Sequence, residues 1–427
     1  MKVLVIGGGG REHAICWKLK QSPRVTELLC APGNGGIAQV ARCIPEVKAT
    51  DLEGVLALCR RERVDFVVVA PDDPLALGMV DMLEREGIPA FGPNQSAARM
   101  ESSKIFSKNL MKKYAIPTAA YETFDDAQAA LDYVATAPTP IVIKADGLAL
   151  GKGVLICEDE QAAVDGVRAI MLDKRFGDSG NHIVVEEFLE GPEVSVLAFT
   201  DGKVVKPMVS SMDHKRAGDH DTGLNTGGMG TIAPNPYYTP AVAERCMREI
   251  FLPTIAAMNA EGRTFRGCLY FGLMITKDGP KVIEYNCRFG DPETQVVLPL
   301  LKSDLLTIMR ACEDGTLDQT DVEFSDGAAC CVILASGGYP EKYEKGKEIA
   351  LKGAESASNV QVFHSGTALK DGALVTNGGR VLGVTATADN LGSAIQDAYA
   401  AAKKIHFDGM FMRSDIGARA MQALKND

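Results

Sequence analysis

Short apolar strands alternate with helical patterns through the first hundred residues, and this alternation constrains the fold more than any other feature of the chain. The expected strands are residues 3–6, 64–70 and 88–91. Strands that alternate with helices predict a parallel sheet covered by helices, with ligands at the carboxyl ends of the strands. We therefore expect a doubly wound α/β domain over residues 1–100, in which residues 71–74 form a loop and a helix follows from Leu75.

The remaining sequence divides into three further regions, because 427 residues are too many for one hydrophobic core. Residues 101–190 combine helices expected at 103–114, 126–135 and 161–172 with strands at 141–145, 154–157 and 183–187. Residues 191–325 form an α+β layer with strands at 194–200, 267–276 and 281–288. Residues 326–427 contain mostly short strands with one helix near 391–404, and Asn377–Gly378 indicates a hairpin. The whole chain is expected to be a multidomain protein of mixed α/β and α+β class.

Composition excludes several classes of protein. The net charge of −11 argues against broad nucleic-acid binding, which needs a basic face. No segment reaches the apolar length of a membrane span, and the N-terminal apolar run is too short for a signal peptide. Eleven cysteines without a CxxC spacing indicate reduced, buried thiols. We expect a cytoplasmic protein that binds neither nucleic acid nor membrane; its oligomeric state stays open, with a monomer slightly favoured.

Four consecutive glycines, residues 7–10, lie between the first strand and the first helix. Such a turn lets the backbone approach a phosphate at a helix N-terminus. The dinucleotide fingerprint fits poorly, because its third glycine would fall on Glu12 or His13. We predict a phosphate-binding turn, while a tight turn without a ligand is the alternative. The stretch at residues 33–36, which includes Asn34, could add a second backbone cradle at the same sheet edge.

Lys144 ends an apolar strand and precedes a glycine-rich stretch that includes Gly151, Lys152 and Gly153. The stretch is not a Walker A loop, because the glycine spacing differs and a strand follows instead of a helix. An unpaired ammonium is costly to bury, so Lys144 requires an anionic partner. A glycine loop that closes over polyphosphate would exclude water from the site. We predict a lid over polyphosphate.

An acidic, extended segment follows the strand at 183–187 and leads to Glu193. Such a linker can offer a carbonyl and an N–H to an adenine edge, and a later carboxylate can accept ribose hydroxyls. Taken by itself, this segment fits a solvated acidic loop better than a nucleotide site.

The most informative motif is the strand that carries Glu284, Asn286 and Arg288. Side chains alternate along a strand, so these three share one face and the apolar residues between them share the other. Carboxylate and amide oxygens suit Mg²⁺, which also binds substrate phosphates. An arginine there could pair with a substrate carboxylate or a transferring phosphoryl group, and a solvent-facing ion pair is the alternative. Asp213, followed by a glycine-dense run, is typical of a functional loop.

These motifs occur in the order found in the glycinamide ribonucleotide synthetase family of the ATP-grasp superfamily, which the chain resembles along essentially its whole length. The matching pieces are VIGGGGREHA, PGNGG, KADGLALGKGV, VVEEFLEG, DHKR, NTGGMG, EYNCRFGDPETQ, SGGYP, FHSGT and TNGGRVLGVTA. The resemblance implies a Rossmann-like N-terminal domain, a two-part ATP-grasp core divided at residue 190, and a small β-rich C-terminal domain. It also implies a purine-biosynthetic ligase that joins glycine to 5-phosphoribosylamine through glycyl phosphate, with ATP and Mg²⁺ or Mn²⁺.

The resemblance assigns roles to individual residues. ATP would be bound by Lys104, Lys144, Gly151, Lys152, Gly153, Glu186, Glu187, Leu189 and Glu193. The metal ligands would be Glu284 and Asn286. The catalytic residues would be Arg288, Asp213 and Lys144. Phosphoribosylamine and glycine would be bound by Gly9, Gly10, Asn34, Asp72, Pro74, Asp213 and Arg288.

Three positions depart from the family pattern: Asp72 stands where glutamate is usual, Ser102 replaces a glycine, and Leu224 replaces a proline. Two other ATP-grasp activities stay open, a different carboxylate–amine ligase and a carboxylase. A nicotinamide-dependent dehydrogenase and a non-catalytic nucleotide-binding or scaffold protein are more distant alternatives.

Overall fold

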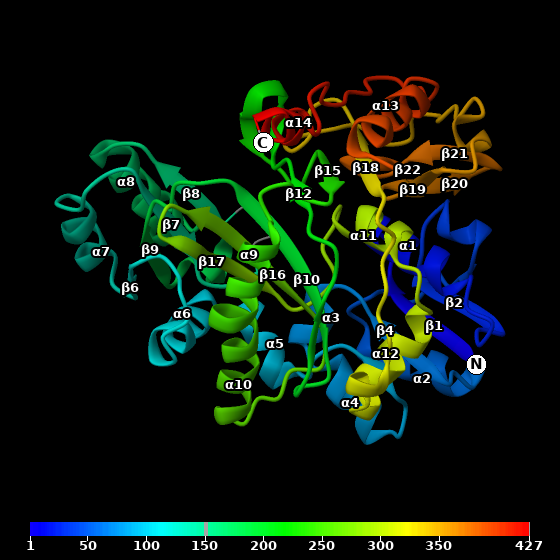
Figure 1. Ribbon diagram of the computed structural model, residues 1–427, viewed down its shortest axis with the longest axis horizontal. Coiled ribbons are helices and arrows are strands. Elements are labelled where there is room, and N and C mark those ends of the chain that lie inside the picture. Colours follow the sequence, from blue (N-terminus) through cyan, green and yellow to red (C-terminus); the bar gives the residue numbers. More distant parts are fainter. Residues whose placement is uncertain (149–152, 427) are drawn as a thin grey trace.

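The computed structural model describes residues 1–148 and 153–426, and it begins with a five-stranded parallel sheet (Figure 1). The strands, in the order β3-β2-β1-β4-β5, are β3 (Arg42–Cys43), β2 (Glu27–Pro32), β1 (Lys2–Gly7), β4 (Phe66–Val69) and β5 (Ala90–Phe91). All four pairings are parallel, which confirms the predicted sheet. Strand β1 is buried on both faces, with Val3 and Val5 in one core and Leu4 and Ile6 in another.

The helices of this first region are α1 (Gly10–Leu19), α2 (Leu52–Glu62), α3 (Asp72–Ala76) and α4 (Met79–Arg85). The expected loop at residues 71–74 is wrong, because α3 begins at Asp72 and includes Pro74 in its first turn. A proline is tolerated there because first-turn N–H groups have no partner within the helix. The acidic side chains of Asp72 and Asp73 favour the same helix start, since they face the positive end of the helix dipole.

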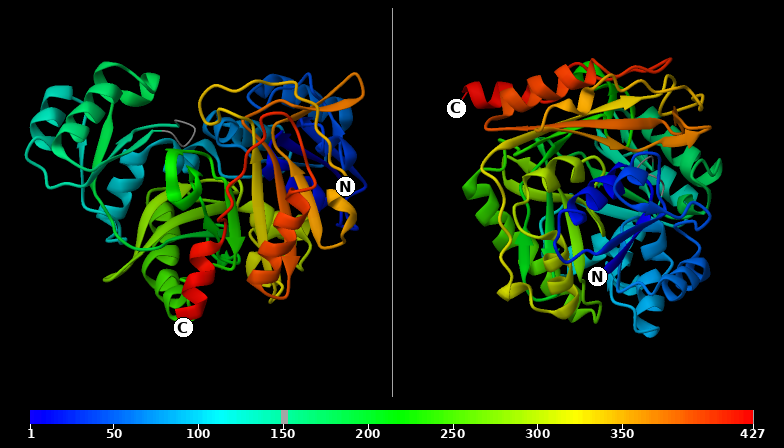
Figure 2. Two further views of the ribbon diagram at one scale, coloured as in Figure 1. Left: turned by 90° about the horizontal axis from the view of Figure 1, so that it is seen from above. Right: turned by 90° about the vertical axis from the view of Figure 1, so that its right-hand side faces the viewer.

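A second sheet forms a lobe that projects from the rest of the molecule (Figure 2, left). Its strands, in the order β6-β9-β7-β8, are β6 (Tyr121–Phe124), β9 (Ile183–Glu187), β7 (Ile141–Ala145) and β8 (Val154–Cys157). Helices α7 (Ala127–Val134) and α8 (Glu160–Val167) pack on it through a shared apolar core. Two further helices, α5 (Gln95–Ser102) and α6 (Lys104–Lys113), connect the lobe to the first sheet. Sequence analysis predicted α6 and overlooked α5.

The central sheet is antiparallel and carries the most informative motif. Its strands, in the order β11-β10-β16-β17, are β11 (Val205–Pro207), β10 (Glu193–Thr200), β16 (Gly267–Thr276) and β17 (Gly279–Asn286). The nearby helices are α9 (Pro240–Cys246), α10 (Leu252–Ala260), α11 (Thr294–Leu300) and α12 (Leu305–Asp314). The strand predicted to reach residue 288 ends at Asn286, so Arg288 lies on the segment that leaves the sheet.

The last large sheet crosses the expected domain boundary at residue 325. Its strands, in the order β12-β15-β18-β22-β19, are β12 (Met212–Asp213), β15 (Gly230–Ala233), β18 (Ala328–Ala335), β22 (Arg380–Ala388) and β19 (Val360–His364). Two of these strands come from the region before residue 325 and pair with the C-terminal strands through β15 and β18. Helices α13 (Leu391–Ala402) and α14 (Ala418–Asn426) follow, so the expectation of a single helix here is wrong.

Two small hairpins complete the structure. They are β13 (Arg216–Gly218) with β14 (Thr222–Asn225), and β20 (Thr367–Lys370) with β21 (Ala373–Thr376). The hairpin predicted at Asn377–Gly378 is wrong, because β22 pairs with β18 and β19 and not with β21. The tight turn lies instead at Asp371–Gly372, where φ is +51° and +84°. Both positive values fit a type I′ turn, and Asp-Gly and Asn-Gly sequences form such turns equally readily.

Every cysteine in the chain is a free thiol, and all except Cys43 are buried. Among the helices that the structure describes, none combines the length and the apolar character that crossing a bilayer requires.

Candidate active site

Two buried lysines share one carboxylate where the projecting lobe meets helix α6. Glu186 Oε2 lies 3.1 Å from Lys108 Nζ and 3.1 Å from Lys144 Nζ, and all three side chains are at most 5% exposed. Lys144 Nζ also donates to the carbonyl of Ile283 on β17 at 3.0 Å. We call Lys108, Lys144 and Glu186 the lysine cluster. Because it holds two cations and one anion, it has a surplus of positive charge.

The lysine cluster has an unused acceptor. Glu186 Oε1 is buried and has no hydrogen-bond partner among the residues that the structure describes. Lys108 Nζ, in contrast, also donates to Thr118 Oγ1 at 2.7 Å. Burial lowers the pKa of Lys108 to about 8, although Glu186 opposes this shift. A ligand with an N–H donor and a negative charge would therefore complete this site.

Lys104 lies at the start of α6 and faces the same region. Ser103 caps the helix, and Lys104 Nζ donates to the carbonyl of Gly147 at 2.9 Å. Burial lowers the pKa of Lys104, while Glu284 opposes that shift. The described part of the glycine stretch includes Gly147 and Gly153, whereas Gly151 and Lys152 lie outside the described residues.

The predicted metal ligands Glu284 and Asn286 lie on β17, next to these lysines. Burial raises the pKa of Glu284, but Lys215, Lys144 and Lys104 outweigh it and lower the pKa overall. Glu284 Oε1 lies 3.8 Å from Lys215 Nζ, and Asn286 Oδ1 accepts a hydrogen bond from Arg288 at 3.3 Å.

These two residues provide oxygen donors on one strand. Among the described residues, no group of three or more His, Cys, Asp or Glu side chains could hold a metal ion. An ionised carboxylate beside an amide oxygen fits Mg²⁺, which completes its coordination with water and substrate phosphates.

The predicted adenine and ribose residues lie along the connection from β9 to β10. Glu187 is exposed, and its carboxylate accepts from the Ala120 N–H at 3.1 Å and lies 3.4 Å from Lys281 Nζ. Leu189 follows in the irregular segment after β9. Glu193 begins β10 and pairs with Lys215 at 3.2 Å. The adenine and ribose roles of these residues stay predictions.

A second cluster has the opposite balance of charge. Arg288 Nη2 lies 2.7 Å from Glu101 Oε1 and 4.0 Å from Asp72 Oδ2. The other oxygen of Glu101 accepts from the N–H of Cys287 at 2.7 Å. Burial raises the pKa of Glu101, and Arg288 opposes this shift. We call Arg288, Glu101 and Asp72 the arginine cluster, which holds one cation and two carboxyl groups.

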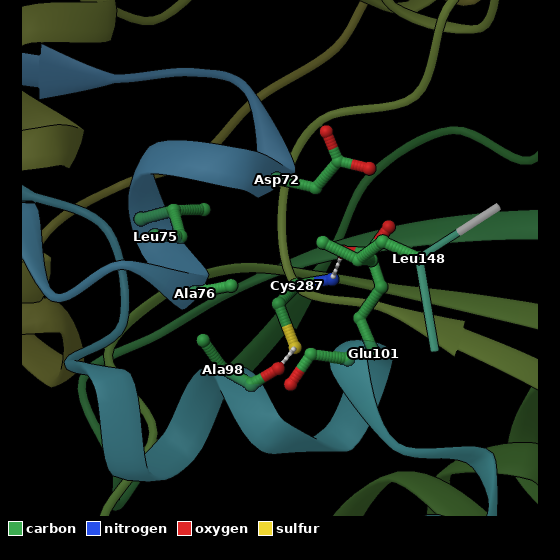
Figure 3. Close-up of a pocket in the computed structure, with 8 residues that line it drawn as sticks. Asp72, Leu75, Ala76, Ala98, Glu101, Leu148 and Cys287 are labelled. Carbon is green, nitrogen blue, oxygen red and sulfur yellow. Dashed lines mark hydrogen bonds between the residues drawn. The ribbon is translucent and has the colours of Figure 1, made fainter. Parts of the chain in front are cut away.

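The two carboxyl groups of the arginine cluster line a narrow pocket of about 150 Å³, a volume that includes open solvent (Figure 3). Asp72 comes from α3 and Glu101 from α5, on either side of Cys287 (Figure 3). The lining residues are Asp72, Leu75, Ala76, Ala98, Glu101, Ser102, Leu148 and Cys287. Its two carboxyl groups make this wall of the protein acidic.

Asp213 ends β12 beside a second buried carboxyl group. Burial and the nearby Glu293 raise the pKa of Asp213 well above its usual range, while Lys215 and Arg380 oppose the shift. Glu293 is itself buried and accepts from the hydroxyl of Tyr270 at 3.2 Å. Carboxyl groups in this setting can pair with a small ligand's ammonium group.

Two N–H groups at the glycine turn predicted to cradle phosphate have partners within the protein. The Gly9 N–H donates to Glu12 Oε2 at 2.6 Å, and the Arg11 N–H lies 3.4 Å from Asp291 Oδ2. A side chain at Gly10 would collide with Ser365 and Gln295. The N–H groups of Gly9 and Arg11 are therefore satisfied within the protein, and the phosphate-binding turn stays a prediction.

Two other predicted substrate residues have structural partners. Asn34 Nδ2 donates to the carbonyls of Gly8 and His364 at 2.9 and 2.7 Å, and its oxygen accepts from the N–H of Gly36. Its side chain thus joins the first sheet to β19. Pro74 is buried within α3.

Sequence analysis overlooked several residues of the site. Lys108 could have been found, because it lies four residues after Lys104 and shares its helix face. Lys215, Glu293 and Arg380 lie inside the quoted pieces DHKR, EYNCRFGDPETQ and TNGGRVLGVTA but received no role, and Glu101 has no comparable local signal.

Comparison with known families agrees with this geometry. Models of the N, ATP-grasp (A) and C domains of phosphoribosylglycinamide synthetase match residues 1–101, 102–294 and 329–419. The phosphoribosylamine–glycine ligase of Vibrio vulnificus strain YJ016 is 46% identical over 423 residues, which cover 99% of each chain. The Brucella melitensis biotype 1 protein of the same name is 49% identical over 426 residues, which cover 100% of this chain and 99% of that one.

Solved structures give the same result. The crystal structure of phosphoribosylamine–glycine ligase from Thermotoga maritima has a TM-score of 0.85 at 35% identity and covers 97% of this chain and 100% of its own. The biotin carboxylase of Campylobacter jejuni has a TM-score of 0.72 at 14% identity, covers 96% and 92%, and shares the fold alone. The three family models and the full-length relatives together show that this chain belongs to the phosphoribosylglycinamide synthetase family of ATP-grasp enzymes.

Proposed function

We propose that the protein joins glycine to 5-phosphoribosylamine at the expense of ATP, giving glycinamide ribonucleotide, ADP and phosphate. The observation that carries this proposal is the bond from Lys144 on β7 to the carbonyl of Ile283, the residue before Glu284. It supports one cleft in which a triphosphate meets the polar face of β17. We place this step of purine biosynthesis in the cytoplasm, with no nucleic-acid or membrane partner.

In this mechanism a carboxylate oxygen of glycine attacks the γ-phosphorus of ATP, and ADP leaves. The amine nitrogen of phosphoribosylamine then attacks the acyl carbon of glycyl phosphate, phosphate leaves, and the nitrogen loses a proton. The chain contributes mainly positioning and charge, as is usual for phosphoryl transfer.

On the nucleotide side, Lys104 and Lys144 would bind the phosphates beneath the stretch with Gly151, Lys152 and Gly153. Glu186, Glu187 and Leu189 would bind adenine, and Glu193 would bind the ribose. The unused oxygen of Glu186 supports this assignment, because the adenine amino group is a donor.

Glu284 and Asn286 would hold Mg²⁺ or Mn²⁺, which neutralises phosphate charge when bound. Asp213 would orient the glycine ammonium group, and Arg288 the acyl phosphate. Asp72 and Glu101 would face the ribosylamine in the acidic pocket. The backbone around Gly9, Gly10, Asn34 and Pro74 would shape that side of the site. The Gly9 N–H and the Asn34 side chain have partners within the protein, the glycines have no side chain, and proline has no N–H.

An isotope experiment tests the chemistry directly. Glycine labelled with oxygen-18 in its carboxylate should transfer one labelled oxygen to the released phosphate, because the acyl phosphate carries that oxygen away. ADP formation should require glycine and phosphoribosylamine together. Unlabelled phosphate would contradict the intermediate, and turnover that ignores glycine but responds to bicarbonate would favour a carboxylase.

A further inference from the structure

The C-terminal region reaches the glycine side of the site through two side chains. Arg380, the first residue of β22, donates from Nη1 to the carbonyl of Gly227 at 2.7 Å and to that of Asp291 at 2.8 Å. The hydroxyl of Tyr339 accepts from the Gly227 N–H at 3.0 Å. Both groups of the Gly227 peptide backbone are therefore held by residues more than a hundred positions further along the chain.

The held turn presses directly on Asp213. Gly228 has φ +117°, and a Cβ there would lie 2.6 Å from Asp213 Oδ1 and 2.5 Å from Pro292 Cδ. Its N–H donates to Thr226 Oγ1 at 3.0 Å, which fixes the other side of the turn. Because there is no room for a side chain between the turn and the carboxylate, a displaced turn would change the packing around Asp213, which the His214 N–H also holds at 2.7 Å.

The guanidinium group matches this task in shape and in charge. It lies against Gly227, where a Cβ would approach Arg380 Cζ to 3.0 Å, and its side chain is only 18% exposed. Its Nη2 also lies 3.5 Å from Asp291 Oδ1. A planar group with several fixed donors can hold two carbonyls at once, which a lysine ammonium on a flexible stem does poorly.

We propose that Arg380 is a positioning residue for glycine, which clamps the Gly227–Gly228 turn and the Asp291 backbone so that Asp213 meets the glycine ammonium group. This inference rests on the proposed function. The inference makes the C-terminal region part of the amino-acid site. Arg380 would act through the turn and would not contact the substrate.

Steady-state kinetics of the full-length protein test the inference, with KM measured separately for glycine, ATP and phosphoribosylamine. Arg380→Ala should raise the KM for glycine at least about tenfold, a change equivalent to about 1.4 kcal/mol, and leave the KM for ATP within about twofold. Arg380→Lys should raise the KM for glycine by less than Arg380→Ala does, because its ammonium keeps the charge and can donate but is held less precisely by a flexible stem. Arg60→Ala, which removes an arginine of an exposed ion pair far along the chain, should behave as wild type.

Tyr339→Phe provides a second variant that removes one hydrogen bond without changing charge. It should raise the KM for glycine in the same direction by a smaller factor, about threefold. If Arg380→Ala fails to fold, Arg380→Lys and Tyr339→Phe decide the question.

An unchanged KM for glycine in these variants, or an equal rise for all three substrates, would overturn the positioning role. A wild-type protein whose ADP formation ignores glycine would instead refute the proposed function, and the inference would fall with it.

Discussion

The lysine cluster and the arginine cluster balance charge in opposite ways. In the first, two lysines share the one carboxylate of Glu186. In the second, Arg288 faces two carboxyl groups, one at 2.7 Å and one at 4.0 Å. Both are largely shielded from water, so the surplus charge of each acts more strongly than it would on the surface.

This difference indicates which ligand each cluster suits. A triphosphate is stabilised by a surplus of cations, whereas a sugar amine with hydroxyl donors is stabilised by a surplus of carboxylates. The two clusters lie near Glu284 and Arg288, where the proposed transfer would occur. The surplus of cations would thus hold the nucleotide at the lysine cluster, and the surplus of carboxylates would hold the amine at the arginine cluster.

The largest expected effect comes from removing a cation of the lysine cluster. Lys144→Ala should lower kcat/KM by about a thousandfold or more, because the lysine acts on charge that develops during phosphoryl transfer and also bonds β17. Steady-state ADP formation measures this loss, and the exposed Lys20→Ala serves as the control. Activity within about threefold of wild type would show that the cluster does not act on the reacting phosphate.

The arginine cluster should be the next most sensitive. Arg288→Lys keeps the charge but replaces the fixed planar donor beside Glu101 and Asn286 with a mobile ammonium, so kcat/KM should fall about a hundredfold. The loss should appear in kcat and in the KM for phosphoribosylamine, measured at saturating ATP. If only the KM for ATP rose, the arginine cluster would act on the nucleotide, and the proposed division of ligands between the two clusters would be wrong.

The KM for ATP should depend on pH through Lys108 of the lysine cluster. Burial lowers the pKa of Lys108 to about 8, so this lysine loses its proton as the pH rises past that value. The KM for ATP should then rise several-fold between about pH 7.5 and 9, because the lysine cluster loses one positive charge.

The sign of the linked stability change separates this effect from unfolding. Lys108 in the unfolded chain keeps its proton to a higher pH, so the unfolded state binds more protons above pH 8 and this group adds stability as the pH rises. Lys108→Arg stays charged and should flatten the pH profile of the KM for ATP. The same rise in that variant would assign the effect to another group.

The smallest expected effect concerns the acidic pocket. Asp72→Glu restores the longer side chain usual in the family and should bring the carboxylate closer to Arg288, which now lies 4.0 Å away. The KM for phosphoribosylamine should change by no more than about threefold, since Asp72 is partly exposed. A change above about tenfold would show that Asp72 contacts the substrate directly.

Local pattern was sufficient to predict the longer apolar strands of the first three regions and the placement of Glu284 and Asn286 on one face of β17. Lys144 was recognised because it ends an apolar strand, where an unpaired ammonium is costly to bury, and Glu284 because side chains alternate along a strand. The parallel first sheet followed from strand–helix alternation in the same way.

Features that depend on distant segments could not be predicted. The glycine turn before α1 was correctly placed, but its neighbour Asp291 lies 280 residues from Arg11. Asn-Gly and Asp-Gly are equivalent turn formers, and only strand pairing decides that the hairpin lies at Asp371–Gly372. Arg380 and Tyr339 lie in recognisable motifs, but their contacts with Gly227 come from tertiary packing that the local sequence does not reveal.

The sheet shared by β12, β15, β18, β22 and β19 limits how the gene could be divided. A protein expressed in two pieces split near residue 325 would leave β15 and β18 each with a bare edge, and bare edges promote aggregation. The pieces should therefore be insoluble alone and recover by complementation when produced together. A cut in an exposed loop within one sheet, such as the turn at Asp371–Gly372, should be tolerated far better.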